Sequence, residues 1–365
     1  PDFSAKYGEE AAEGGSLIVE SSKRSRVVPN STLFESEIDY ETYSQKITGF
    51  DGEGRITSAI AYVTGDDLPV LYQVCGHSEL AIGGSLQTSI EKANVEIRDL
   101  NLMECETIPE DAGGVVILSP TQDISKDDAD KLKSYMDGGG KVIAVTSLTD
   151  TPLDNLTGVF KDYGLTLTEG LVVDPAPSYY YENPYYLLPD VAPSVISSEL
   201  ASQNRNILMP FSQGIIVQEN NEEGAPTVNQ VLTTSGDSYA KKGTNPENWE
   251  YEPGDEMGPF ALGVYVSHMN DDTKETELLW LTTEYMLSEQ ANALTANANF
   301  ELIDNMIARM KGEETGLSIP AKKYMADNFT IPRTVFFFGF TVTTVLIPVI
   351  LIVVGLIIWL SRRKK

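Results

Sequence analysis

The sequence has few of the residues that build metal centres and covalent frameworks. Its 365 residues include two cysteines and two histidines. This small number excludes a disulfide-rich scaffold and a zinc cluster, and His77 and His268 cannot assemble an ordinary His/Cys metal site. We therefore expect no metal and no cofactor. Cys75 and Cys105 leave two alternatives open, a single disulfide between them and two free thiols.

Basic residues are also scarce. The chain holds 26 Lys and Arg against 54 Asp and Glu, which gives a formal net charge of −28. Four of the basic residues lie in the last five positions, so residues 1–334 carry a net charge of −32. Binding to nucleic acid requires a basic surface patch, and so does peripheral binding to an anionic membrane. The acidic charge balance argues against both kinds of binding.

Nucleotide-binding and calcium-binding signatures are absent as well. The glycine-rich stretches at 83–86 (GGSL) and 138–141 (GGGK) lack the Walker spacing. The second stretch follows an expected helix, where glycine acts as a C-cap. No acidic loop has the EF-hand spacing. These absences exclude an ATPase and an EF-hand protein.

No apolar run near Pro1 could serve as a signal peptide. A large exported domain requires a targeting signal. We therefore expect that this chain is the remainder of a longer protein, with a further membrane span before Pro1.

One long uncharged run is present, at the other end of the chain. Residues 335–360 contain no charged side chain in 26 positions, and Arg362, Arg363, Lys364 and Lys365 follow. About 20 apolar residues suffice to span a bilayer core of roughly 30 Å. The pattern predicts a transmembrane helix over 334–360 and a cytoplasmic basic tail over 361–365. The preceding residues would then be extracytoplasmic at the cell membrane, with 312–333 as the connector.

The middle of the chain alternates between apolar strands and amphipathic helices. We expect strands at 69–75, 95–102, 114–118 and 141–146, and helices at 83–93 and 125–136. Short connections between such elements are typical of a parallel, helix-covered sheet, so the fold class is α/β. A helix at 54–64, with Ile56, Ile60 and Val63 inward, precedes this passage. A linker over 1–15 and a strand within 16–28 begin the chain.

A more elaborate half follows the core. The core of the 16–311 domain would be 69–173, ending in a helix at 153–163 and a strand at 165–173, and the elaborated half would be 174–311. There we expect strands at 206–217, 227–234, 259–269 and 277–283, an acidic surface insertion at 235–258, and a helix at 292–310.

Ligands of a parallel sheet bind at the carboxyl ends of its strands. Here those positions hold 75–79 (CGHSE), 119–121 (SPT) and 146–147 (TS). His77 with Glu79 and Cys75 is the cluster that most resembles a catalytic set, although a Cys/His pair two residues apart rarely meets. Three interpretations stay open: a structural histidine bonded to the next loop, a ligand contact, and a catalytic group.

Five tyrosines lie within eight positions, at Tyr179, Tyr180, Tyr181, Tyr185 and Tyr186. Aromatic rings are enriched in interfaces. The cluster predicts a partner interface or a platform for a glycan or peptide, and the alternative is that these rings pack on the domain's own sheet.

Three segments carry a family resemblance. They are YQVCGHSEL at 72–80, VVILSPTQDISKDDADKLKSYMDGGGKVIAV at 115–145, and the chain end from IPAKKYMADNFTIP to IPVILIVVGLIIWLSRRKK. They resemble the gliding-motility-type (GldG-like) auxiliary components of ABC transporters, with Ser78 in place of the glycine of Gly-His-Gly-Glu. The resemblance implies a Rossmann-like domain related to class I amidotransferases without a nucleophile elbow. It implies an ABC-2 type permease and its ATPase as partners, and it transfers no catalytic residue.

The sequence thus predicts a non-enzymatic, membrane-anchored auxiliary subunit of an ABC-2 type transport complex. Two alternatives remain. One is a degenerate amidotransferase-like hydrolase acting at His77 and Glu79. The other is a scaffold like the oligosaccharyltransferase subunit of the endoplasmic reticulum that shares this fold.

Overall fold

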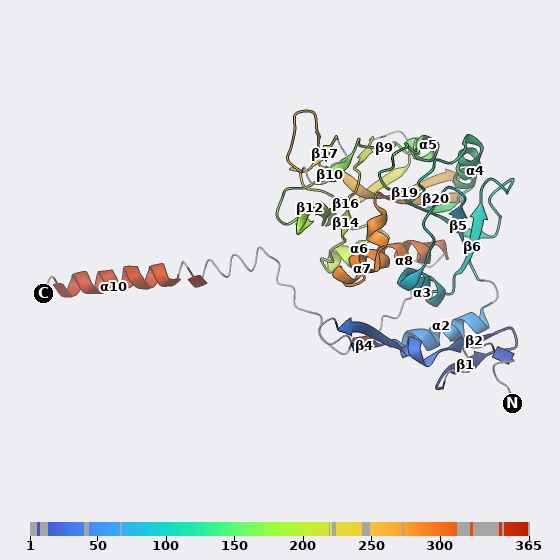
Figure 1. Ribbon diagram of the computed structural model, residues 1–365, viewed down its shortest axis with the longest axis horizontal. Coiled ribbons are helices and arrows are strands. Elements are labelled where there is room, and N and C mark those ends of the chain that lie inside the picture. Colours follow the sequence, from blue (N-terminus) through green and yellow to red (C-terminus); the bar gives the residue numbers. More distant parts are fainter. Residues whose placement is uncertain are drawn as a thin grey trace. The chain divides into compact units, whose positions relative to one another are not determined.

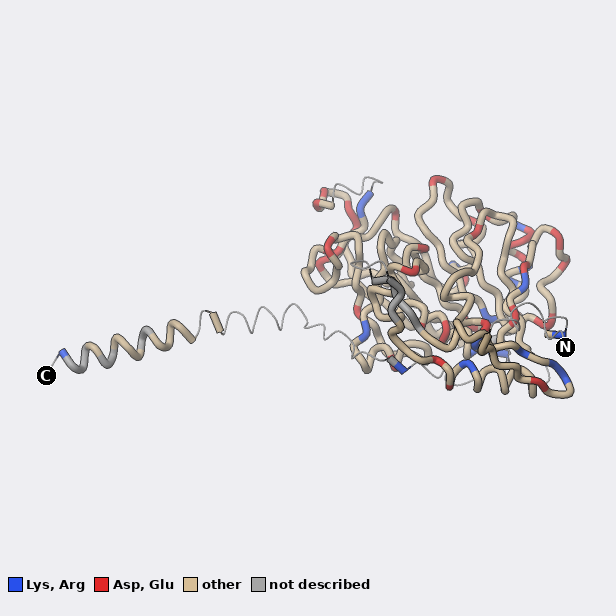
Figure 2. The backbone as a smooth tube through the Cα atoms, turned by 60° about the horizontal axis from the view of Figure 1, so that its bottom comes forward, with Lys and Arg blue, Asp and Glu red and all other residues tan. Residues whose placement is uncertain are grey.

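The computed structural model describes residues 6–7, 14–39, 44–65, 68–218, 220, 224–242, 249–271, 274–311, 322–323, 343–344 and 347–363. The chain divides into two compact units, Pro1–Lys322 and Lys323–Lys365. Along the described backbone, acidic residues outnumber basic ones (Figure 2), as the composition requires.

The described strands and helices have the following bounds. The strands are β1 (Leu17–Glu20), β2 (Ser25–Val28), β3 (Phe34–Asp39), β4 (Ser44–Phe50), β5 (Val70–Cys75), β6 (Glu96–Asn101), β7 (Ala112–Leu118), β8 (Lys141–Val145), β9 (Leu165–Leu167), β10 (Leu171–Val173), β11 (Tyr180–Tyr181), β12 (Asn183–Leu187), β13 (Asp190–Val191), β14 (Met209–Pro210), β15 (Ile215–Val217), β16 (Thr227–Thr233), β17 (Tyr239–Lys241), β18 (Glu256–Met257), β19 (Ala261–Asp271), β20 (Lys274–Leu281) and β21 (Lys322–Lys323). The helices are η2 (Asn30–Leu33), α2 (Gly52–Thr64), α3 (Gly84–Lys92), α4 (Lys126–Asp137), α5 (Asp154–Lys161), α6 (Ser198–Ser202), η3 (Glu284–Leu287), α7 (Glu289–Leu294), α8 (Ala298–Met310) and α10 (Ile347–Arg363).

A ten-stranded sheet forms the centre of the first unit. Its main path runs in the order β13-β16-β19-β20-β8-β7-β5-β6, and β15 joins β19 to β9. Strands β20, β8, β7, β5 and β6 are parallel to one another. The α/β fold class is therefore confirmed, and so are the core strands expected from 69 to 146. The sheet is mixed rather than wholly parallel, because β13, β16 and β19 pair antiparallel.

Apolar side chains of the parallel strands alternate between two cores, one on each face of the sheet. Leu71 and Ile143 pack with side chains of α3 and α8, and their neighbours Val70 and Val142 pack with those of α4 and α5. Figure 1 shows the two pairs of helices on opposite sides of the sheet. Strands buried on both faces have continuous apolar sequences, which explains why the sequence identified them.

The elaborated half departs from the predictions where residues adopt a left-handed backbone. The strand expected over 165–173 is two strands in different sheets, β9 and β10, separated at Gly170 (φ +78°). The strand expected over 206–217 is interrupted at Phe211 (φ +54°), and the helix expected over 292–310 is broken at Ala296 and Asn297. Regular structure cannot continue through a positive φ.

Two further predictions were wrong in detail. In α2, Ile60 is 50% exposed, and Ala59 joins Val63 on the buried side. The surface insertion predicted over 235–258 contains a buried strand, β17, which pairs with β10 and β18.

The predicted termini lie mostly outside the described residues. This applies to most of the linker over 1–15, to most of the connector over 312–333, and to residues 334–342, 345–346 and 364–365. Of the predicted membrane helix, the structure describes α10 and residues 343–344. Within the described parts of the chain, no helix has both the length and the apolar character needed to cross a bilayer.

Candidate functional site

The turn after β5 is held tightly against the end of the neighbouring strand β7. Gly76 (φ +117°) and Ser78 (φ +61°) reverse the chain around His77. The backbone N–H groups of Thr121 and Gln122 donate to the carbonyl oxygen of His77 at 3.2 and 3.1 Å. These two hydrogen bonds tie the turn to the loop that follows β7.

The His77 imidazole lies between two carboxylates. Its Nδ1 lies 3.1 Å from Glu79 Oε1, and its backbone N–H donates to Glu79 Oε2 at 2.7 Å. Its Nε2 lies 3.9 Å from Asp128 Oδ2. The three side chains are only 7%, 3% and 1% exposed. Residues from the turn and from α4 thus form one buried cluster.

Asp128 is anchored by its own helix. Ser125, the N-cap of α4, accepts from the Asp128 N–H and donates to its Oδ2 at 2.7 Å. Lys131 donates to Asp128 Oδ1 at 2.9 Å and to the Leu102 carbonyl at 2.6 Å. Burial alone would raise the pKa of Asp128, but the hydrogen bonds from Lys131 and Ser125 outweigh it and hold the pKa below its usual value. The same contact with Asp128 raises the pKa of Lys131.

Asp128 was not among the residues predicted from the sequence. Ser125 was recognised as an N-cap, and the third helical position after a cap is one where a side chain folds back toward the start of the helix. That pattern locates Asp128 at the helix start. It does not reveal that His77 lies opposite, because this contact joins positions 51 residues apart in the sequence.

The His77 ring has a hydrogen-bonding distance to Glu79 and a longer approach to Asp128. A general base must reach the proton that it removes from a substrate. Each ring nitrogen of His77 instead faces a buried carboxylate within the domain. The arrangement joins the turn after β5 to α4.

The two cysteines lie in different environments. Both are free thiols in the structure, so the second of the two alternatives for Cys75 and Cys105 applies here. Burial raises the pKa of the Cys75 thiol, whereas a nucleophilic cysteine needs a lowered one. Cys105 Sγ lies 3.6 Å from the Leu102 carbonyl oxygen, to which it donates.

The rest of the carboxyl-end edge is also internally bonded. Trp280 Nε1 donates to Thr146 Oγ1 at 2.9 Å, and the Glu284 N–H donates to Ser147 Oγ at 2.9 Å. The Ser119 N–H donates to the Val145 carbonyl at 2.7 Å. The polar groups predicted at the ends of β7 and β8 thus bond to neighbouring segments of the sheet.

The five tyrosines do not form one surface. Tyr185 is buried, and Tyr179, Tyr180 and Tyr186 are half-buried, while Tyr181 is 39% exposed. Tyr179 donates to Asp190 Oδ2 at 2.6 Å.

Phe211 gathers part of this aromatic cluster. Its ring stacks with Tyr185 at a centroid distance of 5.9 Å and meets Tyr186 edge-on at 5.3 Å. It also contacts Tyr285, which is 49% exposed. Much of the predicted aromatic surface therefore packs on the domain itself.

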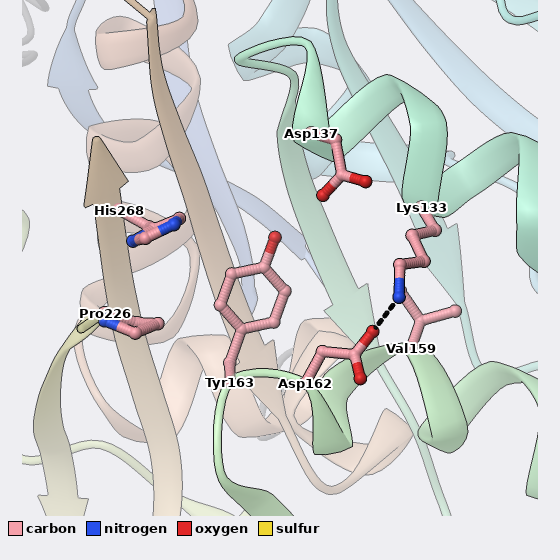
Figure 3. Close-up of a pocket in the computed structure, with 7 residues that line it drawn as sticks. All are labelled: Lys133, Asp137, Val159, Asp162, Tyr163, Pro226 and His268. Atoms are coloured by element: carbon pink, nitrogen blue, oxygen red, sulfur yellow. Dashed lines mark hydrogen bonds and ion pairs between the residues drawn. The ribbon is translucent and has the colours of Figure 1, made fainter. Parts of the chain in front are cut away.

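A cavity of about 200 Å³ lies near the other histidine, His268 (Figure 3). His268 pairs with Thr276 beside the start of β20, at the amino-terminal edge of the parallel strands and away from His77. Its Nδ1 is buried and has no hydrogen-bond partner among the described residues. The remaining lining residues are Lys133, Asp137, Val159, Asp162, Tyr163 and Pro226. Within the described ranges, no three acidic, histidine or cysteine side chains are grouped to hold a metal ion.

No protein-family model matches the chain, and no curated protein matches it. Among solved structures, the chain is similar to the mmIFT52 N-terminal domain, with a TM-score of 0.48 and 16% identity over 66% of this chain and 97% of that one. It is also similar to a cytoplasmic protein from Salmonella typhimurium, with a TM-score of 0.37 and 10% identity over 70% of this chain and 100% of that one. Both TM-scores are low, so the α/β class rests on the strand order and helix placement given above.

Proposed function

We propose that the chain is a non-enzymatic, membrane-anchored auxiliary subunit of an ABC-2 type transport complex. Its α/β domain would act on the extracytoplasmic side of the cell membrane. Its partners would be the permease, the ATPase subunit and the bilayer.

The observation that carries the non-enzymatic part is the environment of His77. Both ring nitrogens face buried carboxylates, Glu79 at 3.1 Å and Asp128 at 3.9 Å. Nδ1 is at hydrogen-bond distance from Glu79, and Nε2 faces the buried Asp128 rather than an open pocket, which supports a structural role for the ring. The raised pKa of Cys75 is consistent with this proposal.

Sequence features support the membrane and transport parts. The uncharged run over 335–360, followed by four basic residues, is typical of a membrane anchor with a cytoplasmic tail. The GHSE turn at 76–79 and the segment from 115 to 145 resemble the gliding-motility-type auxiliary components. An anchored domain without nucleotide-binding motifs needs an ATPase partner to take part in active transport.

The test is purification of the full-length protein from its native membrane in a gentle detergent, followed by mass spectrometry. We expect a multi-span permease and an ABC ATPase to co-purify in stoichiometric amounts. The matched control is the chain truncated before residue 334, which should lose the permease. A full-length protein that purifies alone would overturn the subunit proposal.

One observation favours a second candidate, a degenerate amidotransferase-like hydrolase. A histidine between two carboxylates, as at Glu79 and Asp128, also occurs in sites that move protons. Glu79→Gln separates the two proposals once folding is verified by circular dichroism. The subunit proposal expects the variant still to co-purify with the permease and the ATPase. The hydrolase proposal expects the wild-type protein to hydrolyse an amide substrate and the variant to lose that activity.

A further inference from the structure

Three residues with exposed side chains contact the buried Tyr239 of β17, Trp249 through its backbone carbonyl. Trp249, Tyr251 and Met257 are 44%, 51% and 53% exposed, and Tyr239 is only 5% exposed. Tyr239 donates its hydroxyl hydrogen to the Trp249 carbonyl and meets the Tyr251 ring edge-on at 5.4 Å. Met257 is its direct partner across β17 and β18, so the two side chains share a face. The exposed residues therefore lie together.

A buried lysine fixes the backbone of this segment. Lys241, 4% exposed, donates to the Glu250 carbonyl at 2.7 Å and lies 3.2 Å from Glu252 and 3.5 Å from Asp255. Burial would lower the pKa of Lys241, but the carboxylates of Glu252 and Asp255 outweigh it and raise the pKa.

Asp255 completes this anchor. Its carboxylate accepts from the backbone N–H of Glu252 at 2.8 Å and of Lys242 at 3.2 Å. These contacts involve backbone groups and the side chains of Lys241, Glu252 and Asp255, so they do not use the side chains of Trp249, Tyr251 or Met257. The exposed rings are thus displayed on a preorganised segment, which reduces the entropy lost on binding.

The segment is strongly acidic. Residues 249–257 (WEYEPGDEM) contain four carboxylates and no basic residue. Lys241 contributes one positive charge beneath them, and it pairs with Glu252 and Asp255. Exposed Trp and Tyr rings attract cations to their faces, and surrounding carboxylates strengthen that attraction. The surface is therefore complementary to a ligand that carries positive charges beside apolar groups.

We propose that Trp249, Tyr251 and Met257 form a docking surface for a cationic peptide segment of a partner protein, one in which Lys or Arg alternates with apolar side chains. The rings would contact the apolar groups and the cations, and Glu250 and Glu256 would lie at the rim. This inference goes beyond the proposed function and does not depend on a transport complex.

Tryptophan fluorescence of the full-length chain gives a direct test. The sequence has three tryptophans, of which Trp280 is fully buried and Trp359 lies in α10. In the Trp359→Phe variant, a change in solvent-exposed emission therefore reports on Trp249. The probes are short synthetic peptides in which Arg alternates with Leu, and peptides of the same length in which Glu replaces Arg.

We expect the Arg peptides to shift the emission to shorter wavelength and the Glu peptides to leave it unchanged. Measured by calorimetry in the wild-type background, Trp249→Ala or Tyr251→Ala should weaken binding roughly tenfold, as interface aromatics do. Met257→Ala should weaken it by a smaller factor. The matched control is Met269→Ala. Met269 has the same 53% exposure elsewhere on the domain, so its removal should leave the affinity for the Arg peptide unchanged.

Three outcomes would overturn the proposal. The first is equal binding of Arg peptides by wild type, Trp249→Ala and Tyr251→Ala, because binding would then follow net charge alone. The second is equal binding of Arg and Glu peptides. The third is self-association that Trp249→Ala abolishes while no peptide binds, because the surface would then contact a second copy of this chain.

Discussion

Ser89 on α3 donates a hydrogen bond to Asp304 on α8, with 2.5 Å between Ser89 Oγ and Asp304 Oδ2. The contact joins two helices on the same face of the sheet. Burial raises the pKa of Asp304 to about 6 despite this bond, and the charge of Glu301 adds to the effect while Lys92 opposes it. The α3–α8 contact thus contains a carboxyl group that stays neutral to a higher pH than an exposed aspartate does.

The Asp304→Asn variant should be more stable than wild type at neutral pH. The pKa of Asp304 in the folded protein lies above its usual value of 3.8. The neutral carboxyl therefore stabilises the fold fully below pH 3.8, and this stabilisation is lost as pH rises through about 6. We expect a gain on the order of 2 kcal/mol in unfolding free energy at pH 7, vanishing near pH 4. Urea unfolding across this range measures it. Asp130→Asn, which removes an exposed carboxylate from α4, should show no such trend.

The His77→Ala variant should be destabilised. Removing the imidazole leaves the buried Glu79 and Asp128 carboxylates without the group between them, which should cost about 3 kcal/mol. Thermal unfolding measures the loss. Gln122→Ala, which removes an exposed contact to Ser78, should change stability little. A His77→Ala protein of unchanged stability would contradict the structural role.

Ser78 is the position where the sequence departs from the Gly-His-Gly-Glu pattern, and it has a left-handed backbone (φ +61°). Ser78→Val should destabilise by about 2 kcal/mol, because a β-branched residue tolerates this conformation poorly. Ser78→Gly should change the free energy of unfolding little, because glycine relieves the backbone strain in the folded state but increases the conformational freedom of the unfolded chain. Chemical denaturation of both variants measures which of the two is more stable. A Val variant as stable as the Gly variant would contradict the backbone assignment.

Two glycines of similar appearance should respond oppositely to alanine. A Cβ at Gly140 would lie 2.4 Å from the ring of Tyr135 and 2.6 Å from its carbonyl oxygen, so Gly140→Ala should cost about 2 kcal/mol. A Cβ at Gly158, inside α5, meets nothing within 4 Å, so Gly158→Ala should stabilise by about 1 kcal/mol through helix propensity. Melting temperatures of the two variants are the measurement, and shifts of the same sign would refute the packing argument.

Glu277 is fully buried among partners from three elements. Its carboxylate accepts from Tyr265 and from Arg309 Nε and lies 3.1 Å from Lys141 Nζ. Burial would raise the pKa of Glu277, but the hydrogen bonds from Tyr265 and Arg309 and the charge of Lys141 lower it below 4.5.

The Glu277→Gln variant should lose about 3 kcal/mol at neutral pH, since two cations would lose their counter-charge. A lowered pKa means that the stabilisation is present above 4.5 and is lost as pH falls through the folded value. The difference from wild type should therefore shrink in acid, as pH-dependent urea unfolding would show. Glu275→Gln, at an exposed position of the same strand, is the control and should show neither effect.

The sequence alone determined the elements whose pattern is local. Strands β5, β7 and β8 are mostly apolar because both faces are buried, with Gln73 in β5 and Lys141 at the start of β8 as exceptions. Ser125 begins α4 because its side chain satisfies a backbone N–H at the helix start. The turn at His77 was also recognisable, since a glycine and a short polar stretch follow an apolar strand.

Only the tertiary structure decided which distant segments meet. The pairing of β20 with β8 joins residues 136 positions apart, and His77 meets Asp128 across 51 positions. Neither contact has a local signature, because any apolar strand could add beside β8 and any acid on α4 could face the turn. Tyr185 became buried while Tyr181 stayed exposed because Phe211, in a left-handed conformation, packs against the former. Local chemistry therefore determined the strands and helices of the core, and long-range packing determined the environment of each functional candidate.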